Sequence, residues 1–240
     1  MISHKHRCIF IHIPKTGGMS VEQAFLKSLG LRFYLGQNAP LLLSYNKNLS
    51  IGPQSLAHLS PLDYVKHSYL SETLFNDYYK FAIVRNPWER MVSIYKHFSY
   101  HRYISFKTFL EIEFPKLKAD RYYFVKPQVE YVYDKEGNLL IDFVGRFESL
   151  VSDFKFVSNQ VDYQVAPLEH INKSNTRFKR YGRGHLKFVY KALKEKPYLL
   201  KYLNLNITVD KDYRTLYCDT AKSIVQDFYA EDIEMFNYSF

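Results

Sequence analysis

The chain of 240 residues has little of what marks secreted or membrane proteins. It contains two cysteines, Cys8 and Cys218, which are too few for a disulfide framework and favour a reducing compartment, with one bridge as the alternative. No run approaches the roughly 20 apolar residues that cross a bilayer, so no integral membrane segment is expected. The first predicted strand begins near Cys8, which leaves no room before it for a signal peptide. If Met1 is the native start, we expect a cytoplasmic protein; otherwise the chain is a truncated lumenal domain.

Internal repeats, low-complexity tracts and clear linkers are also missing, which predicts a single domain over residues 1–240. Hydrophobic residues make up 47% and charged residues 24%, a balance that excludes a disordered chain. Tryptophan occurs once, against 22 tyrosines and 19 phenylalanines. Most of these rings are expected in the core, although the flat face and polar edge of tyrosine also suit sugar rings.

The chain carries a formal charge of +9, which favours an anionic partner by long-range attraction. Nucleic acid, an anionic polysaccharide, a membrane surface and a phosphate-rich cofactor all fit this charge. A modest basic cluster runs from Lys173 to Lys187. By itself it is either a solvated loop or part of an anion site.

Two strand–loop–helix units organise the chain. Residues 8–13 (CIFIHI) form a short apolar run typical of a buried parallel strand. The segment 14–18 breaks it, Ser20 is predicted to cap the following helix, and Gly30 to end that helix. A second buried strand is predicted over residues 81–84 (FAIV).

The signals for the later elements are of the same kind. Asn86, Pro87 and Glu89 have the spacing of a helix N-cap with a capping box, and Ser60 before Pro61 marks another helix start. Residues 131–147 look like two strands joined by a glycine-containing turn. Alternation of strands and helices predicts an α/β fold, a P-loop-like doubly wound parallel sheet flanked by helices.

The turn PKTGGMS, residues 14–20, has the composition of a phosphate cradle. Glycines allow close backbone approach, and the amides and dipole at a helix N-terminus favour an anion. Lys15 adds a positive charge, and Thr16 and Ser20 add hydroxyls. The turn is not the loop of nucleotide triphosphatases, because the order Gly-x4-Gly-Lys-Ser/Thr is missing. Alone it is also compatible with an ordinary turn.

A second anion site is suggested at the end of the other strand. Arg85 follows the predicted strand 81–84, at the edge where ligands of parallel sheets bind, and Ser93 lies eight residues later on the next helix. A guanidinium and a hydroxyl placed in this way suit a second phosphate. The alternative is that Arg85 pairs with a neighbouring carboxylate.

Together these motifs resemble one family, the sulfotransferases that use 3′-phosphoadenosine 5′-phosphosulfate (PAPS), and within it the carbohydrate sulfotransferases, of the uronyl 2-O type or bacterial family 2. The resemblance rests on IHIPKTGGMS and VRNPWERMVSIY, in order and at strand ends, and extends to FVGRFESLVSDF, HINKSNTRFKRYGRGH and IVQDFYAEDIEMFNYSF. It implies the sulfotransferase fold.

The resemblance also implies the residues of the donor site. Those expected to hold the 5′-phosphosulfate are Pro14, Lys15, Thr16, Gly17, Gly18, Met19 and Ser20. Arg85 and Ser93 are expected to hold the 3′-phosphate, and Asn172, Lys173 and Ser174 to close over the nucleotide. Met19 departs from the threonine that is commoner in the family, which removes one possible phosphate hydroxyl.

A catalytic base is implied by the segment LAHLSPLDY, residues 56–64, which resembles the one that carries a catalytic histidine in uronyl 2-O-sulfotransferases. Those enzymes have a His-x-His pair; Leu56 replaces the first histidine, so only His58 carries over. If His58 is not the base, Glu22 and Glu130 are the candidates that remain. Gln128 resembles a position of the family that lies near the acceptor, although it is explained equally well as a polar residue of a strand.

The function implied is transfer of a sulfuryl group from PAPS to a hydroxyl acceptor, most simply a glycan, with adenosine 3′,5′-bisphosphate as product. Lys15 acts on the leaving group and His58 as base. No metal and no nucleic acid are expected; His4, His6 and His12 have metal-like spacing, but no second cluster completes a site. The alternatives are a P-loop nucleotide kinase or hydrolase, and a non-catalytic binder of anionic glycan or nucleic acid.

Overall fold

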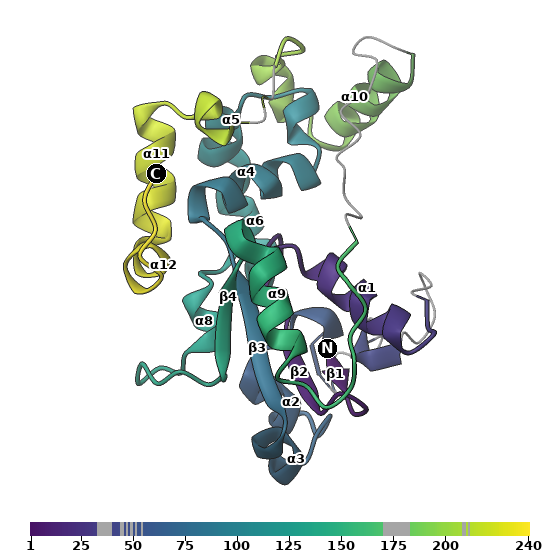
Figure 1. The fold of residues 1–240 in the computed structure, drawn as a ribbon. Coiled ribbons are helices and arrows are strands. Elements are labelled where there is room, and N and C mark those ends of the chain that lie inside the picture. The colour runs from purple at the N-terminus through teal and green to yellow at the C-terminus, as the bar shows by residue number, and fades with distance from the viewer. Residues whose placement is uncertain are drawn as a thin grey trace. The chain divides into compact units, whose positions relative to one another are not determined.

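The computed structural model describes residues 1–32, 40–43, 46, 48, 50, 52–53, 55–169, 183–207, 210 and 212–240. The chain divides into two compact units (Figure 1). The first comprises Met1–Arg85 and Lys126–Ile171, and the second comprises Asn86–Val125 and Asn172–Phe240.

The first unit is built on a four-stranded sheet in the order β1-β2-β3-β4. The strands are β1 (Ile2–Ser3), β2 (Cys8–Ile11), β3 (Tyr79–Val84) and β4 (Phe143–Arg146). β1 pairs with β2 in antiparallel fashion, whereas β2, β3 and β4 are parallel to one another. Every residue of β2 is buried, as the apolar run predicts. The parallel-dominated sheet with flanking helices confirms the predicted fold class.

Helices and turns of the first unit surround this sheet. They are α1 (Gly18–Ser28), η1 (Pro40–Leu42), η2 (Leu56–His58), α2 (Pro61–Lys66), α3 (Glu72–Asp77), α8 (Val129–Val132), η5 (Phe147–Ser149) and α9 (Leu150–Ser158). One core cluster joins Phe25 of α1 and Phe154 of α9 to Phe10 and Phe81, which are register partners in β2 and β3. α2 starts after Ser60, as predicted, and Ser60 forms a capping box with Asp63. Gly30 lies just beyond α1 with φ 66°, also as predicted.

Two sequence predictions are wrong in detail. Residues 131–147 do not form two paired strands: Val129–Val132 is helical, a single bridge joins Tyr133 to Leu139, and only Phe143–Arg146 extends the sheet. Ser20 does not cap α1, because that helix already begins at Gly18 after a left-handed Gly17. A glycine at that position has no Cβ to oppose the left-handed turn, so the helix starts earlier than the hydroxyl signal indicates.

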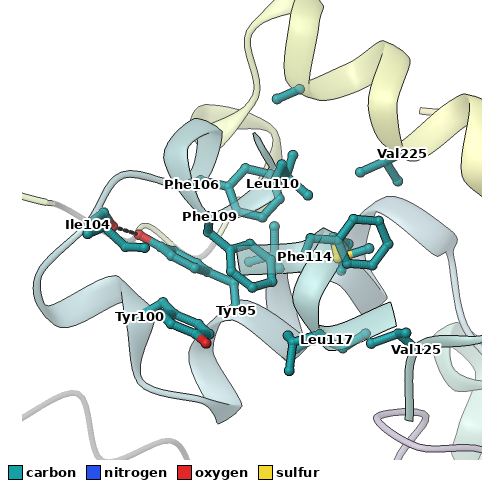
Figure 2. Packing of buried hydrophobic residues seen from close by; sticks show 14 of the residues in the cluster. Tyr95, Tyr100, Ile104, Phe106, Phe109, Leu110, Phe114, Leu117, Val125 and Val225 are labelled. Carbon is teal, nitrogen blue, oxygen red and sulfur yellow. Dashed lines mark hydrogen bonds between the residues drawn. The ribbon is translucent and has the colours of Figure 1, made fainter. Parts of the chain in front are cut away.

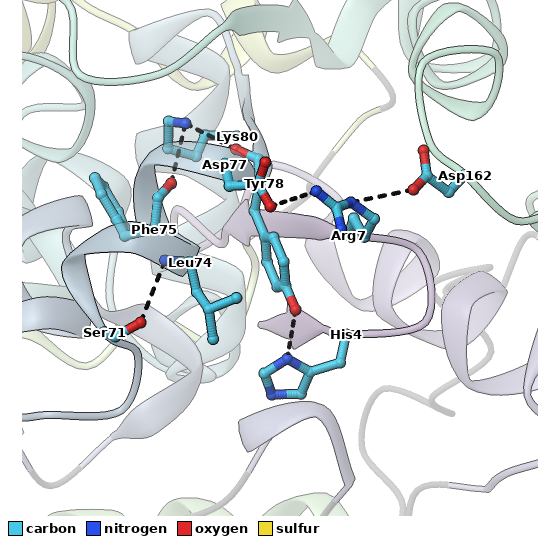
Figure 3. A network of polar contacts seen from close by, with 9 residues as sticks. All are labelled: His4, Arg7, Ser71, Leu74, Phe75, Asp77, Tyr78, Lys80 and Asp162. Atoms are coloured by element: carbon cyan, nitrogen blue, oxygen red, sulfur yellow. Dashed lines mark hydrogen bonds and ion pairs between the residues drawn. The ribbon is translucent and has the colours of Figure 1, made fainter.

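A polar network ties the β1–β2 turn to the segment that leads into β3 (Figure 3). His4 Nδ1 lies 2.7 Å from the Tyr78 hydroxyl, and Arg7 pairs with both Asp77 and Asp162. The buried Lys80 ammonium donates to the Tyr78 carbonyl at 2.7 Å. These contacts hold β2 and β3 alongside each other from their amino ends.

The second unit is helical. Its elements are α4 (Pro87–His97), η3 (Tyr100–Arg102), α5 (Phe106–Thr108), η4 (Phe109–Glu113), α6 (Phe114–Asp120), α7 (Tyr122–Val125), α10 (Arg183–Glu195), η6 (Pro197–Tyr202), η7 (Tyr213–Leu216), α11 (Asp219–Phe228) and α12 (Ala230–Met235). Asn86 caps α4 through the amides of Trp88 and Glu89, as predicted. Among the described residues, no helix is long and apolar enough to cross a membrane.

Aromatic side chains dominate the core of this unit (Figure 2). Tyr95 of α4 packs edge-on against Phe106, with ring centroids 5.2 Å apart, and its hydroxyl donates to the Ile104 carbonyl at 2.5 Å. Phe109 and Phe114 continue the cluster toward Val225 of α11. Core packing therefore accounts for much of the high aromatic content.

A fully buried carboxylate, that of Glu113, joins η4 to η6 within the second unit. It accepts hydrogen bonds from Tyr100 at 2.8 Å and Tyr198 at 2.7 Å, and it pairs with Lys196 and with Lys116. Burial alone opposes ionisation, but the bonds from Lys196, Tyr198 and Tyr100 prevail and lower the pKa of Glu113 to about 2. The carboxylate is thus ionised and satisfied inside the unit.

Glu113→Gln is expected to lower the free energy of unfolding by about 1–3 kcal/mol, because charged hydrogen bonds are lost in a buried place. Since the folded pKa of Glu113 lies below its ordinary 4.5, the stabilisation is present above about pH 4.5 and fades as the pH falls toward 2. Urea unfolding from pH 7 to 3 measures both effects. Glu111→Gln, at an exposed position paired with Lys107, is the control and changes little. Equal losses for the two variants would contradict this account.

Candidate active site

Three parallel strands end at one edge of the sheet, and the candidate residues follow those ends. The register pairs Ile11 of β2 with Ala82 of β3, and Val84 of β3 with Arg146 of β4. The segments that leave this edge are the turn 12–17, Arg85, and Phe147 at the start of η5. An edge of this kind is where open α/β sheets bind their ligands.

The turn after β2 is shaped by two residues in the left-handed region. Lys15 has φ 71° and Gly17 has φ 88°, and α1 begins directly at Gly18. The Ser20 amide is used inside the turn, where it donates to the Gly17 carbonyl at 3.0 Å. Gly18 and Met19 are the first two residues of α1, and the first amides of a helix have no acceptor within the helix. These two main-chain donors stand at the positive end of an 11-residue helix, which suits an anion.

The side chains of the turn divide into structural and outward-facing ones. The Thr16 hydroxyl is buried and donates to the Ile13 carbonyl at 2.9 Å, so its one proton is occupied. Met19 is 49% exposed and Ser20 is half-buried. Pro14 is buried at the end of the strand segment. Thr16 therefore contributes to the shape of the turn, and its expected contact with phosphate stays a prediction.

Arg85 lies against the turn. Its Nη1 donates to the Lys15 carbonyl at 3.2 Å, and its guanidinium lies over the Phe147 ring at 4.0 Å from the centroid. Partial burial and the neighbouring Arg85 charge both lower the pKa of the Lys15 ammonium. Two positive charges from two strand ends are therefore held beside one glycine turn, and a bound anion reduces the repulsion between them.

Gln128 holds the main chain of Arg85. Its side chain is fully buried, donates to the Arg85 carbonyl and accepts from the Arg85 amide, each at 2.8 Å. Gln128 directly precedes α8 and is not part of a strand, so the interpretation as a polar strand residue is wrong. This two-sided bond mimics strand pairing at the point where β3 ends, and it fixes the direction in which Arg85 leaves the sheet.

His58 lies at the end of η2, half-buried, beside the beginning of the turn. Its Nδ1 lies 2.8 Å from the carbonyl oxygen of His12. Because a carbonyl only accepts, Nδ1 carries the proton, and in the neutral ring the lone pair is on Nε2. The ring is thus held in the one tautomer that presents Nε2 as a proton acceptor.

His12 and Glu22 form a buried pair that the sequence patterns do not reveal. His12 Nδ1 lies 2.5 Å from Glu22 Oε1, and both side chains are almost completely buried. The His12 ring also lies edge-on to that of His58, with centroids 4.5 Å apart. The spacing of ten residues crosses a strand end, a turn and a helix start, so no helical or strand periodicity predicts the pair.

Gly18 is required by the same imidazole. A Cβ added at Gly18 would lie 2.1 Å from Cδ2 and 2.3 Å from Nε2 of His12, far inside contact distance. The second glycine of the turn therefore makes room for a side chain of the protein. Gly17, in contrast, is required by its positive φ and by the nearby Phe147 ring.

The other predicted donor residues stay predictions. Ser93 lies half-buried on α4 in the second unit. Asn172, Lys173 and Ser174 lie outside the described residues. The histidines with metal-like spacing take different partners: His4 meets Tyr78 and His6 meets Ser3 at 2.6 Å. Over the described ranges, no group of three metal-ligating side chains occurs.

Comparison with known proteins gives one family. No curated protein matches the chain. The family model described as "Sulfotransferase family" matches residues 1–239, nearly the whole sequence, including the turn after β2, Arg85 and His58. A parallel-dominated sheet with an anion-suited turn at its carboxyl edge agrees with that match. The chain therefore belongs to the sulfotransferase family.

Proposed function

We propose that this sulfotransferase moves a sulfuryl group from PAPS to a hydroxyl of a glycan, with His58 as the general base. The observation that carries the proposal is the contact of the Arg85 guanidinium with the Lys15 carbonyl. It brings cations from two strand ends to a single turn, as a donor with separate 5′ and 3′ anionic groups requires. The likeness of residues 56–64 to uronyl 2-O-sulfotransferases supports a glycan acceptor.

The donor site is assigned to chain segments that fit a phosphate. The amides of Gly18 and Met19 and the ammonium of Lys15 take the 5′-phosphosulfate. Arg85 takes the 3′-phosphate, joined in this proposal by Ser93 and by Asn172, Lys173 and Ser174. PAPS supplies the sulfuryl group as the substrate, and the chain supplies charge and position.

The chemistry of the chain's own residues is positioning and proton removal. His58 Nε2 accepts the proton of the acceptor hydroxyl as that oxygen bonds to sulfur and the bond from sulfur to the phosphate oxygen breaks. Lys15 neutralises the charge that develops on the phosphate oxygen of the leaving adenosine 3′,5′-bisphosphate. Arg85 binds in ground and transition states alike, so its contribution is mainly affinity.

Transfer of labelled sulfate from PAPS is the direct test of activity. A panel of desulfated heparan, dermatan and chondroitin chains, with a phenol as the non-glycan acceptor, covers the acceptor classes. Label on at least one glycan and none on the phenol supports the proposal. Label on the phenol alone would leave a sulfotransferase with a different acceptor class.

Ligand binding tests the donor site without any acceptor. Adenosine 3′,5′-bisphosphate is expected to raise the melting temperature, since a ligand at 100 times its Kd stabilises by about 2.7 kcal/mol. AMP should raise it much less, because it lacks the 3′-phosphate that Arg85 holds. Thermal melts at matched ligand concentrations measure the difference. Equal stabilisation by the two nucleotides would contradict the donor assignment.

Substitution separates the two cations. Lys15→Ala is expected to lower turnover by about 2–4 kcal/mol of transition-state stabilisation, the usual size for a lost donor to a developing charge. Arg85→Ala is expected to raise the KM for PAPS more than it lowers kcat. Steady-state kinetics with saturating acceptor resolve the split. Unchanged kcat in Lys15→Ala rules out the role on the leaving group.

Removal of the base gives the fourth test. His58→Ala should lose roughly 10²–10⁴-fold in kcat with little change in donor affinity. The wild-type rate should rise with pH on its acidic limb, because only the neutral ring accepts a proton. The variant should lose that acidic limb. His67→Ala, at the histidine that directly follows α2, is the control and keeps it. Near-normal turnover of His58→Ala would move the base elsewhere.

A further inference from the structure

The buried His12–Glu22 pair touches both halves of the candidate site. Its imidazole packs against Gly18 of the turn, and the main-chain carbonyl of the same residue accepts the Nδ1 proton of His58. We propose that His12 and Glu22 are positioning residues that hold His58 in its Nδ1-protonated tautomer beside the turn after β2. This inference rests on the proposed function.

The His12 ring is restrained from several sides. Glu22 of α1 accepts from its Nδ1, and the Phe10 ring of β2 is stacked on it at 5.5 Å and 20°. The outer edge of the ring meets Gly18, and the His58 ring lies edge-on. A ring restrained in this way has little freedom in χ1 or χ2, and the peptide unit of residue 12 is held with it.

The fixed peptide unit sets the tautomer of His58. The 2.8 Å contact from His58 Nδ1 ends on the His12 carbonyl, so the direction of that carbonyl decides which ring nitrogen keeps the proton. If Nε2 carried the proton, that nitrogen could not accept the proton of the substrate hydroxyl. A partner that fixes the tautomer of a catalytic imidazole therefore affects its activity as a base. His58 is half-buried on a short turn of three residues, so its own element offers little restraint.

The position of His12 and Glu22 beside the turn and His58 indicates that they do more than stabilise the fold. Buried His–carboxylate contacts are costly to desolvate, and apolar residues of similar shape often replace such pairs without loss of stability. In this chain the pair lies at the junction of β2, the turn and α1 and directly beneath His58. The other histidine that is buried in the described part of this unit, His6, bonds instead to Ser3 and Ser28.

The decisive variant is the double substitution His12→Phe/Glu22→Leu. It keeps a ring against Gly18 and leaves no unpaired buried charge, so the fold and the affinity for adenosine 3′,5′-bisphosphate should be retained within about twofold. The carbonyl of residue 12 remains, but without the bond to Glu22 its direction is no longer fixed. The His58 ring should therefore lose its single Nδ1–H form, and kcat should fall roughly 10²-fold, the cost of misplacing a reacting group by about 1 Å. Glu22→Gln keeps an acceptor for His12 and should lose much less.

Histidine ¹⁵N NMR reports the tautomer without any turnover, with the His58 signal assigned by its absence from His58→Ala. His6→Asn is the matched control at a buried histidine outside the site, and it should change neither the tautomer nor kcat. Gly18→Ala gives a second route, because its methyl would displace the His12 ring while both polar groups remain.

The outcomes separate this inference from the proposed function. Loss of the single His58 tautomer in the double variant and in Gly18→Ala, with His6→Asn unchanged, supports the positioning role. An unchanged tautomer and normal kcat in the folded double variant would overturn it, as would loss of nucleotide affinity alone. If the tautomer changes as expected while the wild type transfers sulfate to no acceptor, the positioning role stands and the proposed function fails.

Discussion

The parallel alignment of β2, β3 and β4 is the constraint on which the candidate site depends. Parallel strands place their carboxyl ends at one edge, so the turn after Ile11, the exit at Arg85 and the start of η5 at Phe147 come from distant parts of the sequence to one place. The contacts of Arg85 with Lys15 and with Phe147 follow from that alignment. The buried core on α1 and α9 fixes the sheet that carries them.

Several polar side chains near the turn form hydrogen bonds within the protein. Thr16 bonds to Ile13, Gln128 bonds to the main chain of Arg85, and Glu22 bonds to His12. A rigid shell of this kind restrains the few groups proposed to meet the substrate, which lowers the cost of ordering them on binding. The candidate site therefore consists of a few groups proposed to bind the ligand, which are held in place by side chains that are hydrogen-bonded within the protein.

Local chemistry made part of this structure predictable. The apolar runs of β2 and β3, the Asn86 cap and the Ser60 cap all appear in the fold, since each depends on a few neighbouring residues. The contacts that support the site depend on tertiary structure, and sequence patterns could not reveal them: the reach of Gln128 to the end of another segment, and the meeting of His12 with Glu22 across the turn. The sequence predicts a strand at Tyr131 and Val132, because aromatic and β-branched residues favour strands locally, whereas both residues lie in the short helix α8.

The central claim is that Lys15 and Arg85 hold different phosphates of one donor, and ³¹P NMR of bound adenosine 3′,5′-bisphosphate tests it most directly. The account predicts that the protein shifts both phosphate resonances. Lys15→Ala should return mainly the 5′ resonance toward its free position, and Arg85→Ala mainly the 3′ resonance. A protein that shifts neither resonance, or variants that affect the two phosphates in the reverse order, would contradict the account.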